Sequence, residues 1–205
     1  MRTAVRTIAI AVTLMMATVT YAAQDRVALV IGMAEYQSIV PLDNTHNDAR
    51  AIAAALGDIG FGVTLSLDAS RDELELLLDD FAFRSETSDL ALIYFAGHGV
   101  EVQGENFLIP IDADVTSNLE VQRQSVSLKQ LLASVERARK MRIVILDSCR
   151  DNPLGDAIDL TQTTQTATQS TAQATRGGGG LAAANPDRGT LVAFAAKDGQ
   201  VALDG

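Results

Sequence analysis

The chain has 205 residues, enough for one domain with a sizeable core, and 47% of them are hydrophobic, which excludes a wholly disordered protein. Its 26 acidic and 16 basic residues give a net charge of −10, which argues against nucleic acid and anionic membranes as partners. Cationic ligands are weakly favoured.

The first 22 residues are predicted to be a secretory signal peptide. Arg2 and Arg6 form a basic start, residues 8–19 are apolar, and Thr20-Tyr21-Ala22 places small residues at the −3 and −1 positions of a cleavage site. The apolar run is short for a membrane span, although an uncleaved anchor is the alternative. We therefore expect an exported protein, periplasmic or secreted, with no membrane contact after signal removal.

Strands and helices are expected to alternate from Arg26 onward. The apolar run 26–32 is typical of a buried strand. Thr45-His46-Asn47-Asp48 fits a capping box with Thr45 as the N-cap, and the helix it opens ends before Gly60. Residues 63–67 are predicted to be the second strand.

The same alternation continues along the chain. A capping box at 70–73 opens the next helix, and the apolar run 90–95 is the third strand, which leads into Ala96-Gly97-His98-Gly99. Residues 107–110 are typical of a short strand on a hairpin, and a third capping box lies at 127–130.

The fourth strand, Ile143 to Leu146, leads into Asp147-Ser148-Cys149. Residues 156–189 are polar and of low complexity, which predicts a mobile linker, and Thr190 begins another apolar run. Strands alternating with amphipathic helices predict an α/β fold, with a mostly parallel sheet and helices on both faces. The chain ends at Gly205, which suggests truncation inside its last structural unit.

Two of the predicted central strands end in residues that could form one catalytic site. Cys149 is the only cysteine, so it forms no disulfide within the chain, and His98 lies between two glycines. Carboxyl ends of parallel strands share one edge, about 4.8 Å apart for neighbours. A Cys–His pair there could catalyse acyl transfer, with the Gly99 and Cys149 amides as oxyanion donors.

The alternative is that both residues are structural, since a lone cysteine is usually a core residue. The other histidine, His46, shows no partner pattern and is interpreted as a surface residue.

Three segments resemble the caspase-fold cysteine peptidases (peptidase C14), in particular the bacterial metacaspase and paracaspase branch. They are Arg26-Val-Ala-Leu-Val-Ile-Gly32, Tyr94-Phe-Ala-Gly-His-Gly99 and Ile145-Leu-Asp-Ser-Cys-Arg150. The resemblance implies a caspase-like three-layer sandwich with His98 and Cys149 as the catalytic dyad.

The resemblance also implies a domain organisation. Residues 23–155 would be the catalytic, large-subunit-like domain, and residues 156–189 the inter-subunit linker. Residues 190–205 would be the start of a truncated small-subunit-like segment.

The metacaspase and paracaspase branch uses acidic pocket residues and cuts after Arg or Lys. Asp147, Asp48 and Asp204 match the acidic pocket positions, which implies protein or peptide substrates with a basic residue before the scissile bond. The alternatives are a helix cap for Asp48 and a strand-end cap for Asp147. Ala96 stands where some metacaspases carry serine, so one pocket contact is in doubt. In the linker, Arg176 is a candidate self-cleavage site.

The sequence shows no metal site and no required cofactor. Some metacaspases use Ca²⁺ through an acidic site, so the resemblance leaves Ca²⁺ open, although no EF-hand spacing is present. Two other functions stay open: a catalytically weak or inactive caspase-like module for binding or signalling, and a thiol-based redox sensor.

Overall fold

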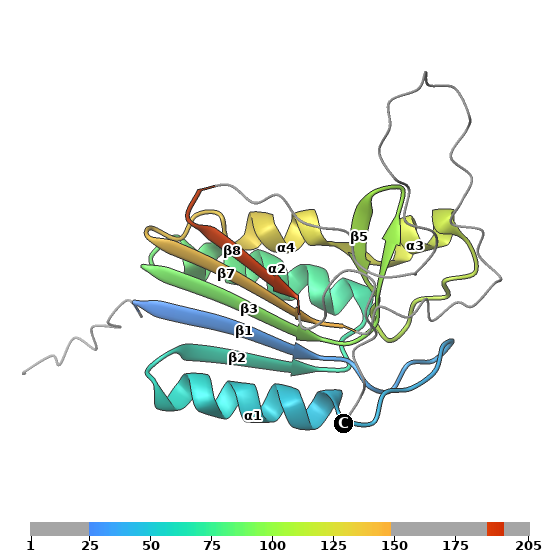
Figure 1. The fold of residues 1–205 in the computed structure, drawn as a ribbon, viewed down its shortest axis with the longest axis horizontal. Coiled ribbons are helices and arrows are strands. Elements are labelled where there is room, and N and C mark those ends of the chain that lie inside the picture. Colours follow the sequence, from blue (N-terminus) through green and yellow to red (C-terminus); the bar gives the residue numbers. More distant parts are fainter. Residues whose placement is uncertain (1–24, 149–187, 195–205) are drawn as a thin grey trace, which may run out of the picture.

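The computed structural model describes residues 25–148 and 188–194. These residues form a five-stranded main sheet and a smaller three-stranded sheet (Figure 1). The strands of the main sheet, in spatial order, are β2 (Gly62–Leu67), β1 (Arg26–Gly32), β3 (Leu90–Ala96), β7 (Met141–Asp147) and β8 (Thr190–Phe194). All neighbouring pairs are parallel, which confirms the predicted α/β fold.

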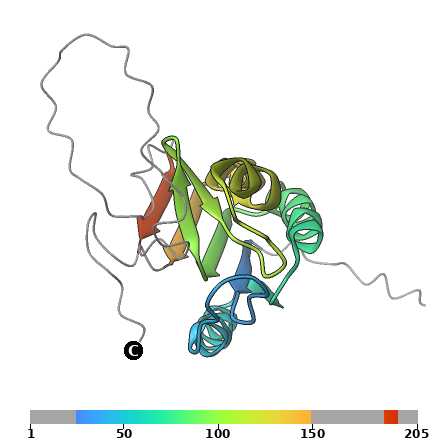
Figure 2. The same ribbon diagram turned by 90° about the vertical axis from the view of Figure 1, so that its right-hand side faces the viewer.

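Helices cover both faces of the main sheet (Figure 2). Helix α1 (Thr45–Asp58) packs on one face, and α2 (Arg71–Ser85) and α4 (Leu128–Val135) pack on the other. In β3, Ile93 and Phe95 belong to the core under α2 and α4, whereas Leu92 and Tyr94 belong to the core under α1. The central strands are continuously apolar because both of their faces are buried.

The smaller sheet follows β3 directly, at the carboxyl edge of the main sheet (Figure 1). Its strands, all antiparallel, are β4 (Gly99–Val102), β5 (Glu105–Leu108) and β6 (Val126–Ser127). In the main sheet, β3 and β7 pair in a register that sets Ala96 beside Asp147. The ends of these two strands therefore meet, as the sequence predicts.

The predicted capping boxes are confirmed at Ser70 and Ser127 but not at Thr45. Helix α1 has Asn44 as its N-cap, with no side-chain capping bond. The buried Thr45 hydroxyl instead donates a 2.8 Å hydrogen bond to the Met33 carbonyl at the end of β1. Because the Thr45 hydroxyl makes this tertiary bond, it does not cap α1. The predicted capping box, in which the Asp48 carboxylate would bond back to the Thr45 backbone, is therefore absent.

Three short elements were given no range from the sequence: strand β4, helix α3 (Asn118–Gln124) and strand β6. Helix α3 is polar and buries only Val121, so it has no apolar stripe that a sequence pattern could reveal. Within 25–148 and 188–194, every helix is too short or too polar to cross a membrane.

The junction between β1 and α1 requires glycine at position 32. A Cβ there would lie 2.7 Å from the Ala49 Cβ and 3.0 Å from the Thr45 carbonyl oxygen. We expect Gly32→Ala to lower the free energy of unfolding by about 1–3 kcal/mol, because overpacking would push α1 off the sheet. Gly57→Ala, in α1 with no atom within 4 Å of the added Cβ, is the matched control and should stabilise by up to about 1 kcal/mol. Urea unfolding curves measure both, and equal effects would contradict the packing argument.

Candidate active site

His98 lies just beyond β3, in the connection to β4. Its ring Nε2 is 2.8 Å from the carbonyl oxygen of Val40. A carbonyl can only accept, so Nε2 carries the proton and the neutral ring presents an unprotonated Nδ1. That Nδ1 is buried and has no hydrogen-bond partner among the described residues. The imidazole is thus oriented through one nitrogen, while the other has a lone pair available to accept a proton.

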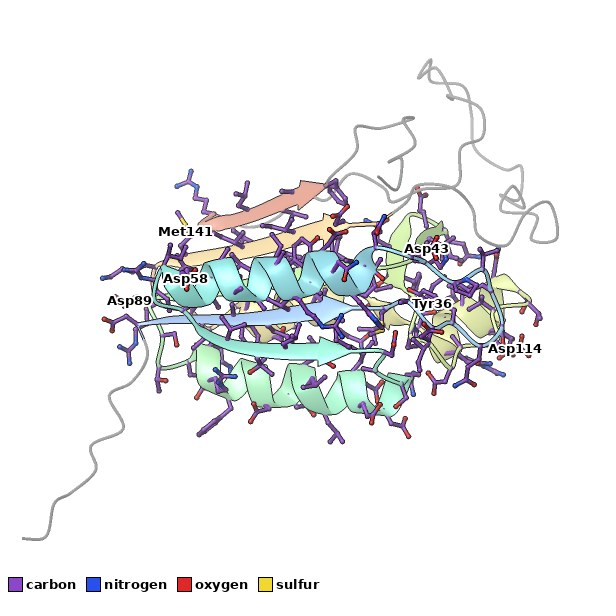
Figure 3. All side chains as sticks on the ribbon, turned by 90° about the horizontal axis from the view of Figure 1, so that it is seen from below. Tyr36, Asp43, Asp58, Asp89, Asp114 and Met141 are labelled. Atoms are coloured by element: carbon purple, nitrogen blue, oxygen red, sulfur yellow. The ribbon has the colours of Figure 1, made fainter. Side chains whose placement is uncertain are left out.

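Tyr36, from the loop between β1 and α1, supports the backbone of His98. The His98 N–H donates a 2.7 Å hydrogen bond to the Tyr36 hydroxyl, and the two ring centroids lie 4.7 Å apart. A Cβ at Gly97 would lie 2.7 Å from the same hydroxyl, so the close approach depends on glycine. Figure 3 shows Tyr36 and Asp43 at the end of the sheet where the strands finish, opposite Asp58.

The environment of His98 favours the neutral ring. The side chain is only 6% exposed, and burial lowers the pKa of His98, an effect that the Val40 carbonyl partly offsets. The ring is therefore a neutral base at pH 7.

Asp147 is the last residue of β7, and its carboxylate is hydrogen-bonded to Tyr94. The Tyr94 hydroxyl donates a 2.8 Å hydrogen bond to Asp147 Oδ2. The pKa of Tyr94 is raised, first by burial, then by the hydrogen bond and charge of Asp147, and last by the charge of Asp48. The charges of Asp147 and Asp48 therefore both raise the pKa of the Tyr94 hydroxyl, which lies on the face of the sheet that α1 covers.

Neither carboxylate is neutralised by a basic side chain within the described ranges, where all ion pairs involve other residues. Asp48 is exposed and Asp147 is partly buried. This arrangement suits an incoming cation. The family resemblance implies a pocket role for both residues, and that role stays a prediction.

Gly99 begins β4 opposite Leu108 of β5. The Ile109 N–H donates to the His98 carbonyl, which makes Gly99 and Leu108 a non-hydrogen-bonded pair. The Gly99 N–H is consequently directed away from β5. Gly99 is buried, and its oxyanion role stays a prediction.

Other predicted features lie outside the described residues. They are Cys149, Asp204, Arg176, the signal peptide and nearly all of the linker 156–189. Ser148, the residue before the cysteine, is buried, and its hydroxyl has no partner in the part of the chain that the structure describes.

Sequence patterns did not single out Val40, Tyr36 or Tyr94 as site residues. Val40 contributes a backbone carbonyl, for which no side-chain signal exists. Tyr94 could have been found, because strand alternation places it on the same sheet face as Asp147 once β3 and β7 are known to be neighbours.

His46, interpreted from the sequence as a surface residue, is only partly exposed and lies beside an acidic side chain. Its ring Nε2 lies 2.8 Å from Oδ2 of Asp68, and the two side chains are only 22% and 20% exposed. Asp68 lies in the connection after β2, 22 positions further along the chain than His46, so no local sequence pattern reveals the pair.

The described residues form a parallel sheet between helices, with His98 after one central strand and Asp147 at the end of its neighbour, an arrangement that fits the caspase-like class of α/β folds. The chain belongs to the caspase domain family, peptidase C14, whose family model matches residues 25–205. The resemblance to the caspase-fold peptidases is thereby confirmed, and the chain contains a caspase-like peptidase domain.

Two curated relatives are each 28% identical over 147 residues. They are the human mucosa-associated lymphoid tissue lymphoma translocation protein 1 and its homolog from Mus musculus. The alignments cover 68% of this chain but only 18% and 17% of those proteins. Among solved structures, protein GSU0716 from Geobacter sulfurreducens aligns with a TM-score of 0.49 and 18% identity over 61% of this chain and 50% of that chain. A likeness this partial adds nothing to the assignment.

Proposed function

We propose that this protein is a cysteine endopeptidase in which Cys149 is the nucleophile and His98 the general base. The observation that carries the proposal is the state of His98, whose Nε2 is held by the Val40 carbonyl while its buried Nδ1 has no hydrogen-bond partner within 25–148 and 188–194. Asp147 ends β7 beside β3, and Cys149 follows two residues later in the sequence. This proximity supports a thiol within reach of the free nitrogen.

In the proposed reaction, His98 Nδ1 takes the proton of the Cys149 thiol as the sulfur attacks the substrate carbonyl carbon. The Gly99 and Cys149 N–H groups stabilise the oxyanion. The imidazolium then protonates the leaving amine, the C–N bond breaks, and a thioester remains. A water molecule, deprotonated by the same ring, hydrolyses the thioester and regenerates the thiol.

The preferred substrate carries Arg or Lys before the scissile bond. Asp147 and Asp48 supply negative charge at the pocket, Tyr94 orients the Asp147 carboxylate, and Asp204 is proposed as a third acid. Grouped carboxylates cost free energy until a cation neutralises them, and a guanidinium does so with two parallel hydrogen bonds. The net charge of −10 further favours basic substrates.

The proposal includes the wider organisation of the chain. The signal peptide 1–22 directs export to the periplasm or medium, and residues 190–205 belong to a small-subunit-like segment. Arg176, in the linker 156–189, is the proposed site of self-cleavage. The dyad needs no cofactor, and Ca²⁺ is included in the test as a possible activator. The described residues hold no group of three or more His, Cys, Asp and Glu side chains able to bind a metal.

The test is a panel of fluorogenic peptides that differ only in the residue before the scissile bond (Arg, Lys or Asp), assayed with and without Ca²⁺. We expect cleavage after Arg and Lys, and about 100-fold or more slower cleavage after Asp, because like charges repel in the pocket. Cys149→Ala is the control and should cleave none of the peptides. The same variant tests self-cleavage, because it should stay intact where the wild type is cut at Arg176. Equal cleavage of both proteins at Arg176 would assign that cut to another protease. No cleavage of any peptide would favour a binding or signalling module.

A further inference from the structure

Asp68 adopts a backbone conformation that few side chains tolerate. It follows β2 with a φ of 51°, in the left-handed region, and its N–H donates a 2.9 Å hydrogen bond to the Gly32 carbonyl at the end of β1. Aspartate, asparagine and glycine are the residues that accept this conformation most readily. In this conformation its side chain lies beside the start of the loop that connects β1 to α1.

The Asp68 carboxylate bonds to the base of that loop. Its Oδ1 accepts hydrogen bonds from the Ala34 N–H at 2.7 Å and the Glu35 N–H at 3.1 Å, and its Oδ2 lies 2.8 Å from His46 Nε2. Burial opposes ionisation, but the two amides and His46 together outweigh it, so the pKa of Asp68 is lowered. An ionised carboxylate thus joins the loop to the first turn of α1.

The same loop carries the groups that orient His98. The Ala34 carbonyl accepts from the Leu42 N–H at 3.1 Å, which closes the loop around Val40. The Val40 carbonyl then holds the His98 ring, and Tyr36 holds the His98 backbone. Hydrogen bonds therefore connect Asp68 to Ala34 and Ala34 to Leu42. Two residues before Leu42 in the backbone, the Val40 carbonyl bonds to the His98 ring.

We propose that Asp68 is a positioning residue that fixes the Val40 carbonyl against His98 and so selects the ring tautomer with a free Nδ1. The proposal rests on the proposed function only in taking His98 as the general base. Asp68 touches neither the imidazole nor a reacting atom and acts through the loop.

Two substitutions that both tolerate the left-handed backbone isolate the carboxylate. Asp68→Gly removes every acceptor, whereas Asp68→Asn keeps a neutral oxygen for the two amides. We expect Asp68→Gly to lower kcat on an Arg peptide by about 10- to 100-fold with little change in KM, as for a displaced catalytic group. We expect Asp68→Asn to recover most of the loss. Ser70→Ala, which removes the cap of α2 but has no bond to the loop, is the matched stability control and should keep kcat.

A second measurement is independent of activity. The chain has two histidines, so ¹⁵N NMR can assign the His98 ring and distinguish its tautomers. The wild type should show Nε2–H, and folded Asp68→Gly should show a mixture. If the wild type cleaves no peptide, the proposed function is wrong. The NMR tautomer of His98 would still show whether Asp68 positions the ring. An unchanged tautomer in folded Asp68→Gly, or a kcat within about threefold of wild type, would overturn the proposal.

Discussion

His98→Ala is expected to lower kcat/KM on an Arg peptide by about 10³-fold, within the usual contribution of a general base. The variant keeps the pocket carboxylates but loses the Nδ1 that would accept the thiol proton. The loss should appear in kcat, because His98 acts in the transition state and not in holding the basic side chain. Thermal unfolding, run in parallel, checks that the variant remains folded.

Alkylation of Cys149 gives a readout without a substrate, since the sequence contains one cysteine. In the wild type a neutral His98 should assist thiol deprotonation near neutral pH, and in His98→Ala the rate should follow the pKa of an unassisted thiol. Identical pH–rate profiles for the two proteins would show that His98 does not act on Cys149.

The pH dependence of the wild type follows from the lowered pKa of His98. Because the folded-state pKa lies below the unfolded value of about 6.5, the base stays neutral to lower pH than a free imidazole. The acid limb of kcat/KM that belongs to His98 should therefore lie below about pH 6.5. For folding, the contribution of His98 is complete above the unfolded pKa and is lost as the pH falls through the folded one. An acid limb above pH 7 would contradict this assignment.

Asp147→Asn is expected to lower kcat/KM for Arg peptides by about 100-fold or more, mainly through KM. The change leaves an incoming guanidinium without its partly buried partner, and breaking such a pair costs about 3–5 kcal/mol in buried sites. Asparagine is isosteric and can still accept the Tyr94 hydrogen bond, so the loss measures charge and not packing. Peptides with alanine in place of arginine should be affected much less.

Two variants control this prediction. Tyr94→Phe keeps both carboxylates and removes only the hydrogen bond to Asp147, so a smaller loss of about tenfold is expected. Asp58→Asn makes the same change in net charge at the far end of α1 and should leave kcat/KM unchanged (Figure 3). If Asp58→Asn and Asp147→Asn had similar effects, long-range charge would explain the preference better than a pocket.

The sequence by itself determined the alternation of the central strands with the helices α1, α2 and α4, and it placed His98 and Asp147 at the ends of two strands. The run 26–32 and the capping boxes at Ser70 and Ser127 were predicted correctly, because apolar runs and caps depend on neighbouring residues. His98 and Asp147 were predicted to share one edge because central parallel strands end together, and the pairing of β3 with β7 confirms it. Helix α3 was missed, since its polar sequence carries no periodic signal.

Only the tertiary structure decided how His98 is held. The Val40 group that orients the ring is a backbone carbonyl, identical in every residue type, so no sequence pattern can mark it. The Asp68 carboxylate reaches Ala34 from 34 positions away, and Tyr94 reaches Asp147 from 53 positions away. Such contacts depend on which strands become neighbours, and the same tertiary competition moved the Thr45 hydroxyl from the predicted cap to the Met33 carbonyl.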